Sequence, residues 1–394
     1  MNNDVFILNT AAVDIRRPDF EFVLKVAAEG GLALCATEDM PACSQAQIRE
    51  WLEQGCGTAG GCGNVAPIMS RAGLSVAIGA NLGAGAYGGL DAQGRFFHDS
   101  MTAYGVDLSD VYVHPHLPTG TAFAHDAAQA DRKGLAVFLN ANNDFDLARF
   151  LRAVRRRRPT VVYYMYSGLS ERADANGGRD LAAFMRACRE QGAVTLADSH
   201  TLTGNPKQLI AEGCSVAKYR LLDPLLPEVD VFFTSSDEAR LIGNTLLDRP
   251  VWQNDPARDN GAFLRAIAAR YWRGGRVRLF GVTVRDGAYV VHGGPDGKVS
   301  DVALVRSPFV ASGGLNLIGA GDAFRAGLMS YVARHVEAFR AGAMDVHEAV
   351  STGNLFAATY VTAPLDDRFA GIRRLEDMLA RLRGQAKEGR GFRD

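Results

Sequence analysis

The chain has 394 residues, of which 47% are hydrophobic and 22% are charged, a composition typical of a soluble globular enzyme with a sizeable core. Its 43 basic and 44 acidic side chains give a formal net charge of −1, without the basic excess that nucleic-acid binding requires. No apolar run approaches the ~20 residues that cross a membrane, and the N-terminus lacks the features of a signal peptide. Six cysteines in so long a chain predict reduced thiols and a cytoplasmic location. We therefore expect a small-molecule partner, with neither nucleic acid nor membrane involved.

The first third of the chain alternates apolar runs with helical patterns. A strand is expected over residues 5–8; it ends in polar residues and is followed by Asp14. A glycine-rich block that opens at Gly55 runs into a predicted helix. The further elements expected here are strands at 32–35 and 74–78 and helices at 45–52 and 64–72. This strand–loop–helix–strand order favours α/β winding.

The rest of the chain repeats that alternation. Near-continuous apolar runs such as residues 161–166 are typical of parallel strands buried on both faces. We expect strands at 161–166, 194–197, 229–233 and 277–284, and helices at 179–191, 261–272, 323–338 and 347–362. Residues 95–135 contain short alternating runs instead and predict an antiparallel appendage. The arginine run at 155–158 is interpreted as a solvated helix C-terminus.

The stretch at residues 316–328 carries the clearest chemical pattern. Gly319, Ala320 and Gly321 precede Asp322, and an apolar helical pattern begins directly after the acid. Small residues let a backbone pass close to a ligand, and amides at a helix N-terminus attract negative charge. Such a turn can hold a transferring phosphoryl group while the carboxylate accepts the proton of an attacking hydroxyl. The same residues also fit an ordinary helix N-terminus, where the dipole favours acids.

Residues 316–328 resemble the C-terminal signature of ribokinase (PfkB) family kinases, D/N-T-x-G-A-G-D-x-F-x-x-G. The resemblance implies an ATP-dependent phosphotransferase in which Asp322 is the catalytic base and the amides of Gly319, Ala320 and Gly321 form the anion hole. Leu317 departs from the usual Thr. The leading residue is Asn316 rather than Asp, at the position where some relatives build a monovalent-cation site, so dependence on such a cation is left open.

A second resemblance to the same family lies near the N-terminus. The stretch at residues 59–66 is similar to the signature in which paired glycines approach a sugar, which implies that Gly60, Gly61 and Asn64 bind substrate. Asp14, after the first strand, looks like the substrate-binding acid of the family; the alternative is an acid that caps a turn. Cys62 and Gly85 are departures, since the family has a smaller residue at the first position and Asp at the second.

Further positions match the nucleotide side of the family in the expected order. Residues 234–239 are similar to its N-x-x-E element, which implies that Glu238 orients the water shell of Mg²⁺. Ser235 stands where the family has Asn. The resemblance implies ATP contacts at these positions: Ser235, Thr283, Asp286, Gly287 and Asn354.

Together these matches predict a ribokinase-like three-layer α/β fold, with a mostly parallel central sheet and a small β-sheet lid. One kinase domain would span residues 1–383, with its lid built from parts of 15–55 and 95–135, and residues 384–394 would form a flexible tail. The expected reaction moves the γ-phosphate of ATP, with Mg²⁺, to a primary alcohol of a sugar or sugar-like molecule. A homodimer through the lid is a hypothesis.

Two other functions remain open at this point. Residues 31–52 resemble the longer lid of adenosine kinases, and Phe20, Phe22 and Phe123 could form walls for a base or simply the lid core. The second alternative is a non-catalytic sugar-binding regulatory protein, which the departures at Gly85, Ser235 and Leu317 allow. The intact turn at residues 319–322 argues against it, because a protein that only binds needs no base.

Overall fold

The structure is a computed structural model, and it describes residues 3–27, 31–125, 134–248, 252–272, 274–309, 315, 317–364 and 367–388. Within these ranges, no helix is long and apolar enough to cross a membrane. All six cysteines have free thiols.

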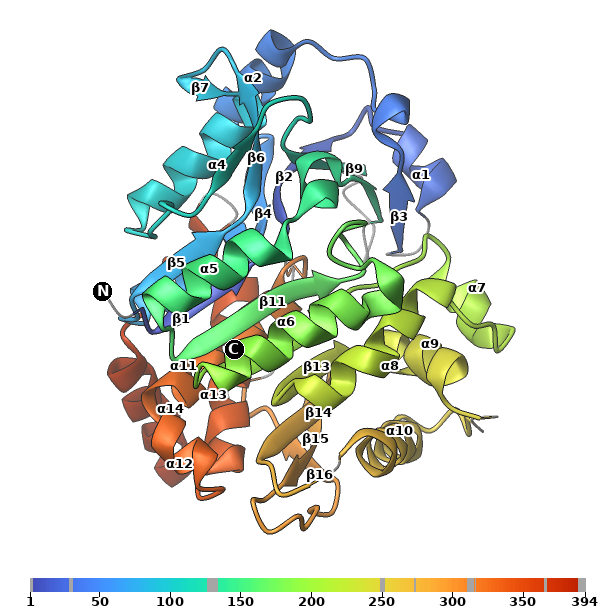
Figure 1. Ribbon diagram of the computed structural model, residues 1–394, viewed down its shortest axis with the longest axis vertical. Helices are drawn as coiled ribbons and strands as arrows, with labels where there is room; N and C mark the ends of the chain where they lie inside the picture. Colours follow the sequence, from blue (N-terminus) through green and yellow to red (C-terminus); the bar gives the residue numbers. More distant parts are fainter. Residues whose placement is uncertain are drawn as a thin grey trace.

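A large, mostly parallel sheet forms the centre of the molecule (Figure 1). Its order is β16-β15-β14-β13-β12-β11-β1-β5. The strands from β5 to β14 pair in parallel, whereas β14, β15 and β16 pair antiparallel at one edge. The bounds are β1 (Val5–Leu8), β5 (Val76–Gly79), β11 (Val161–Ser167), β12 (Val194–Ser199), β13 (Val231–Ser235), β14 (Arg278–Val284), β15 (Gly287–Gly293) and β16 (Ala303–Arg306). All residues of β1 and β11 are buried, which confirms the interpretation of their continuous apolar runs.

Helices cover both faces of this sheet, as expected for a three-layer fold (Figure 1). On one side lie α5 (Leu147–Arg157), α6 (Arg179–Glu190) and α8 (Leu222–Leu225). On the other lie α3 (Cys62–Arg71), α11 (Ala320–Arg334), α13 (Val346–Val361) and α14 (Leu375–Glu388). The remaining helices are α1 (Phe22–Val26), α2 (Gln45–Glu53), α4 (Ala92–Ala103), α7 (Pro206–Ala211), α9 (Ser236–Leu246), α10 (Pro256–Tyr271) and α12 (Val336–Arg340).

A second sheet, the lid sheet, stands at the carboxyl end of β1. Its order is β3-β10-β9-β2-β4, with β2 (Ala11–Arg17), β3 (Leu32–Cys35), β4 (Gly57–Gly61), β9 (Gly120–His125) and β10 (Leu135–Phe138). The chain passes from β1 into β2 through Asn9 and Thr10, which both adopt positive φ. The lid strands therefore reach beyond the predicted ranges 15–55 and 95–135, because the lid starts directly after β1 and takes in the glycine-rich block as β4.

Residues 95–135 are not a single antiparallel appendage. They begin inside α4, continue through β8 (Tyr112–His114) and only then enter the lid sheet. The strand β8 pairs instead with β6 (Asn81–Gly85) in a small sheet that also contains β7 (Gly89–Leu90). At the other end of the chain α14 runs through Glu388, past the start of the tail predicted from residue 384.

The arginine run at the end of α5 is only partly solvated. Arg155 and Arg156 are exposed, but Arg157 is buried. Its guanidinium bonds Asp107 at 2.7 Å, Asn3 at 2.8 Å and Ser109 at 2.6 Å, and it pairs with Asp110. Burial raises the pKa of Asp107. The hydrogen bonds from Arg157 and Ser109 outweigh that rise and lower the pKa to about 2. Arg157 therefore ties α5 to the loop before β8, and the interpretation of the whole run as solvated was wrong at this residue.

Replacing Arg157 by methionine is expected to lower the free energy of unfolding by about 2 kcal/mol, because Asp107 loses its cation while Asp110 keeps Arg156. This value is below that for fully buried pairs, since Asp107 is 41% exposed and solvent offsets part of the loss. Urea unfolding at pH 7 measures the change, with Arg155→Met as the exposed control. The deficit should shrink as the pH falls from about 4 toward 2, where Asp107 takes up its proton in both states. An equal effect of the two substitutions would contradict the assignment.

Candidate active site

The first turn of α11 places Asp322 in the interior, where its side chain is buried. Gly319 caps the helix with a φ of 88°, a left-handed conformation that favours glycine. A Cβ at this position would also lie 2.6 Å from the hydroxyl of Tyr360. That hydroxyl donates to the carbonyl of Ile318 at 3.1 Å and so fixes the turn before the helix. The turn therefore requires glycine at 319 for two independent reasons.

Three side chains hold the carboxylate of Asp322. The amide Nδ2 of Asn64 donates to Oδ2 at 3.0 Å, and the hydroxyl of Tyr166 donates to the same oxygen at 2.7 Å. Arg325, one helical turn further along α11, approaches Oδ1 at 3.3 Å. Asp322 is thus oriented from α3, from the end of β11 and from its own helix, which fixes its position as a proton acceptor requires.

Behind Asp322 lies a second buried acid. Asp198, at the end of β12, is fully buried and pairs with Arg325, whose Nε is 2.6 Å from Oδ2. The hydroxyl of Tyr163 and the backbone amide of Tyr166 also donate to Asp198, at 2.8 Å and 2.6 Å. Burial raises the pKa of Asp198, and the charge of Arg325 opposes that rise. One guanidinium therefore pairs with two buried carboxylates.

Tyr166 is held in an uncommon backbone conformation. Its φ is 54°, and the register between β11 and β12 shifts between Tyr164 and Ser167. Positive φ is rare for a large side chain, and strained residues of this kind cluster at functional sites. The ring lies edge-on to His200, with 4.7 Å between the centroids. The bulge turns the Tyr166 hydroxyl toward Asp322, away from the strand's regular alternation.

The lid contributes Asp14 and two close-packed glycines. Gly60 lies beside Asp14, so near that a Cβ there would come within 2.5 Å of the carboxylate. Gly61 caps α3 with a φ of 58° and packs on the carbonyl of Thr10. Burial raises the pKa of Asp14; Arg16 and Arg368 oppose the rise, and Asp322 adds to it. Asp14 and Asp322 therefore lie within electrostatic reach of each other.

Arg368, after α13, links these parts. Its guanidinium donates to Oδ1 of Asn64 at 3.2 Å, to the Tyr360 hydroxyl at 2.7 Å and to the carbonyl of Ala59 at 3.4 Å. The same side chain thus contacts the glycine turn before α3, the amide that binds Asp322, and the tyrosine that fixes the turn before α11. Arg368 therefore acts on the site through the groups that it positions.

Two of the predicted nucleotide residues lie at the carboxyl ends of β13 and β14. Ser235 and Thr283 are register partners there. Ser235 caps α9 in a capping box, in which its hydroxyl accepts from the amide of Glu238 at 3.3 Å and its own amide donates to Oε2 at 2.9 Å. Thr234 also donates to Oε2, and Thr201 donates to Oε1 at 3.2 Å. Serine thus supplies a helix cap at the position of the family's Asn.

The other nucleotide candidates differ in their surroundings. Asn354 is buried on α13, and its Nδ2 has no hydrogen-bond partner among the described residues, so it is a free donor. Gly287 packs against the carbonyl of Val305, where a Cβ would come within 2.2 Å. Asp286 pairs with the exposed Arg306 at 2.9 Å. α13 lies against α11, since a Cβ at Gly353 would meet the ring of Phe324 at 2.8 Å.

Some predicted features differ in detail. The amide of Ala320 donates to the carbonyl of Leu317 at 3.2 Å, so it closes the turn, whereas Gly321 is at a helix position whose amide has no intrahelical partner. Asn316 lies outside the described residues.

Phe20, Phe22 and Phe123 pack edge-to-face on one another, with 5.0–5.8 Å between ring centroids. That packing favours lid core over walls for a base.

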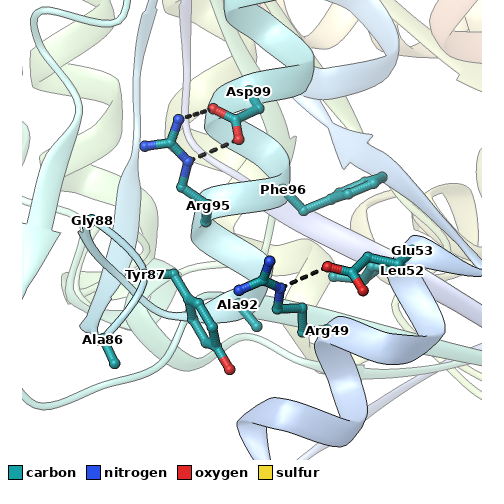
Figure 2. Close-up of a pocket in the computed structure, with 10 residues that line it drawn as sticks. All are labelled: Arg49, Leu52, Glu53, Ala86, Tyr87, Gly88, Ala92, Arg95, Phe96 and Asp99. Carbon is teal, nitrogen blue, oxygen red and sulfur yellow. Dashed lines mark hydrogen bonds and ion pairs between the residues drawn. The ribbon is translucent and has the colours of Figure 1, made fainter.

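Gly85 lies next to a separate hollow, shown in Figure 2, which is lined by its chain neighbour Ala86. A cavity of about 680 Å³ lies between α2, α4 and the β6–β7 hairpin. Its charged side chains are paired with one another: Arg49 with Glu53 at 2.7 Å, and Arg95 with Asp99 (Figure 2). Gly85 packs on the backbone of Asp91, where a Cβ would come within 2.6 Å. The departure at Gly85 is therefore explained by close packing beside this cavity.

The sequence patterns missed several residues of the site. Tyr166, Arg325 and Arg368 contact the predicted residues directly, yet Tyr166 and Arg368 lie outside the motifs and Arg325 occupies a variable position of the C-terminal signature. Arg325 could have been found, because it lies three residues after Asp322 on a helix and such pairs share a face. Tyr166 depends on a bulge and Arg368 on tertiary packing, and neither leaves a pattern in the local sequence.

Comparison with known proteins identifies a family and a shared fold. A family model described as pfkB family carbohydrate kinase matches residues 53–259, slightly more than half of the chain. No curated protein sequence matches. Similar solved structures include a fructokinase with bound ATP from Xylella fastidiosa (19% identity, TM-score 0.63, covering 98% of this chain and 99% of that one). An adenosine kinase from Sinorhizobium meliloti has 18% identity, a TM-score of 0.63 and the same coverage. A fructokinase from Vibrio cholerae O395 with fructose, ADP and calcium has 17% identity and a TM-score of 0.59, covering 96% and 98%. At these identities the structures show a shared fold.

Proposed function

Because the chain belongs to the PfkB family of carbohydrate kinases and is therefore a kinase, we propose that it transfers the γ-phosphate of ATP to a primary alcohol of a sugar or sugar-like small molecule. Asp322 is the general base in this proposal. The observation that supports it most is the buried carboxylate of Asp322 in the first turn of α11, held by Asn64 and Tyr166 within electrostatic reach of Asp14.

Each part of the site has a separate task in this reaction. Asp14, Gly60 and Gly61 bind the acceptor, and Asn64 orients the base toward its hydroxyl. Asp322 accepts the hydroxyl proton as the oxygen attacks phosphorus in line. The N-terminal amides of α11, including Gly321, stabilise the developing charge on the phosphoryl oxygens. No covalent protein intermediate is needed, because positioning and electrostatics supply the catalysis.

The residues present fit ATP. The amide of Asn354 is a buried donor without a partner in the described chain, on the helix that packs beside α11. Ser235 and Thr283 lie side by side at adjacent strand ends, where open α/β sheets bind ligands. ATP would contact these residues together with Asp286 and Gly287, and it supplies the phosphoryl group that is transferred.

The residues also fit a divalent metal held mainly by ATP. Within the described ranges no group of three or more His, Cys, Asp or Glu side chains could hold a metal ion, and Mg²⁺ commonly takes one or two carboxylates plus substrate phosphates. Glu238 would be the protein's carboxylate. Its two oxygens already accept bonds from Thr201, Thr234 and the Ser235 amide, so it would act on water around the ion.

An ADP-release assay with Mg·ATP tests the function against sugars, sugar acids, sugar phosphates and nucleosides. We expect turnover on one class of sugar-like acceptor and none without acceptor, because the lid excludes water from the phosphoryl group. Turnover confined to nucleosides would identify an adenosine-type kinase instead. No turnover on any class, combined with a ligand that raises the melting temperature, would favour a non-catalytic binding protein. A homodimer through the lid stays a prediction.

A further inference from the structure

One face of the lid sheet carries two charged residues among small ones. Successive strand residues point to opposite faces, so Asp14 and Arg16 share a face of β2. Their register partners on the flanking strands are Thr58, opposite Asp14 on β4, and Ala122 and Ala124 on β9. Alanine side chains extend only a short way from the sheet. Arg16 is therefore the long side chain on the face that already carries the acceptor-binding acid.

The opposite face of the lid is filled by its own core. Ile15 pairs there with Phe123, and both are fully buried. The neighbouring Arg17 also lies on this face; it bonds Asp19 at 2.8 Å and covers the ring of Trp51 at 4.9 Å. The two adjacent arginines thus have different surroundings. Arg17 has hydrogen-bond and ring partners on the core face of the lid sheet, and Arg16 lies on the face that carries Asp14.

The guanidinium of Arg16 lacks the partners that a shielded cation needs. Its Nε and Nη2 atoms are buried from solvent, yet neither has a hydrogen-bond partner in the described parts of the chain. The hydroxyl of Thr58 is also buried without a partner. Shielded donors that are left unbonded are costly and are normally satisfied by protein, water or a ligand. These groups together form an incomplete anion site.

Electrostatics place this guanidinium at the acceptor site. Arg16 lowers the pKa of Asp14 and also that of Tyr360, whose pKa burial raises to about 12. Arg368 and Asp322 act on Tyr360 as well. Arg368 already has three hydrogen-bond acceptors, whereas the Nε and Nη2 donors of Arg16 have none among the described residues. A negatively charged group on the substrate that is phosphorylated would accept hydrogen bonds from both donors.

We propose that Arg16 recognises an anionic group, a carboxylate or a phosphate, on the acceptor at the end remote from the hydroxyl that is phosphorylated. The inference rests on the proposed phosphotransfer for its orientation. Two residue steps along the extended strand place the Cα atoms of Asp14 and Arg16 about 7 Å apart on the same face, close enough for one sugar-sized acceptor to contact both side chains. A planar guanidinium bonds either group through two parallel N–H donors.

Calorimetric titration without nucleotide tests the site on matched ligands: glucose, gluconate and glucose 1-phosphate, with the corresponding pentose set. We expect one charged series to bind at least about 10-fold more tightly than its neutral sugar. Whether the carboxylate or the phosphate series does so identifies the group. In Arg16→Gln the preference for charged over neutral ligand should fall about 10- to 100-fold, because charge-assisted hydrogen bonds are lost. Arg17→Gln, on the other face of the same strand, is the matched control and should keep the preference.

The outcomes separate this inference from the proposed function. Equal binding of charged and neutral ligands, no measurable binding of any charged ligand, or an equal effect of Arg16→Gln and Arg17→Gln would overturn the anion site while leaving the kinase reaction intact. If charged ligands bind through Arg16 but wild-type protein releases no ADP with them or with any other acceptor, the anion site stands and the proposed reaction falls. Asp322→Asn should retain the charge preference in the titration, since it removes the base and not the guanidinium.

Discussion

Turnover of the Asp322→Asn variant is expected to fall about 10²- to 10⁴-fold, the range for loss of a general base. The substitution is nearly isosteric, and an amide oxygen can still accept from Asn64 or Tyr166, which hold the carboxylate in the wild-type chain. What the amide cannot do is take up the proton of the acceptor hydroxyl. The measurement is kcat in the ADP-release assay with saturating ATP and acceptor.

A matched control and a binding measurement make this result specific. Glu376 is an exposed acid in the first turn of α14, far from the motif in sequence, and Glu376→Gln should keep wild-type turnover. Asp322→Asn should still bind ATP and acceptor, so its melting temperature should rise with each ligand as it does for the wild type. Near-wild-type turnover of Asp322→Asn would remove Asp322 from the mechanism.

The fold was predictable from periodicity because its elements are strongly patterned. β11 is a continuous apolar run buried on both faces, and such runs alternating with helical patterns specify a mostly parallel sheet. The lid was harder to predict, since β2 begins directly after β1 through two residues with positive φ and β4 is made largely of glycine. Glycine-rich stretches predict turns. Only pairing with β2 makes residues 57–61 a strand.

The site was predictable where local chemistry dictates the residue type. Gly319 and Gly60 are required by a left-handed turn and by the approach of Asp14, and these demands appear in the sequence as small residues at fixed spacing. Of the groups that orient Asp322, Tyr166 comes from a distant segment, 156 residues before it in the chain. The position of a side chain that acts only through such a tertiary contact follows no regular spacing in the sequence, so a sequence pattern cannot identify it.

Replacing Arg325 by methionine is expected to lower the free energy of unfolding by about 3–5 kcal/mol, the loss seen when one member of a buried ion pair is removed. The substitution leaves Asp198 fully buried and without the cation 2.6 Å away. It also removes the contact with Asp322 and the hydrogen bond to Tyr163. Chemical denaturation at pH 8 measures the change.

The pH dependence and a second variant identify the cause of that loss. Burial already raises the pKa of Asp198 above its ordinary value of 3.8, and without Arg325 only the hydrogen bonds from Tyr163 and the Tyr166 amide oppose that rise. The folded variant then binds a proton that the unfolded chain has released, so its stability is greatest below about pH 4 and falls as the pH rises. The deficit relative to wild type should therefore be smaller at pH 5 than at pH 8. The double variant Asp198→Asn/Arg325→Met removes the charge as well as its partner and should recover much of the loss. A double variant no more stable than Arg325→Met, with a deficit independent of pH, would show that Arg325 stabilises this site by packing rather than by neutralising Asp198.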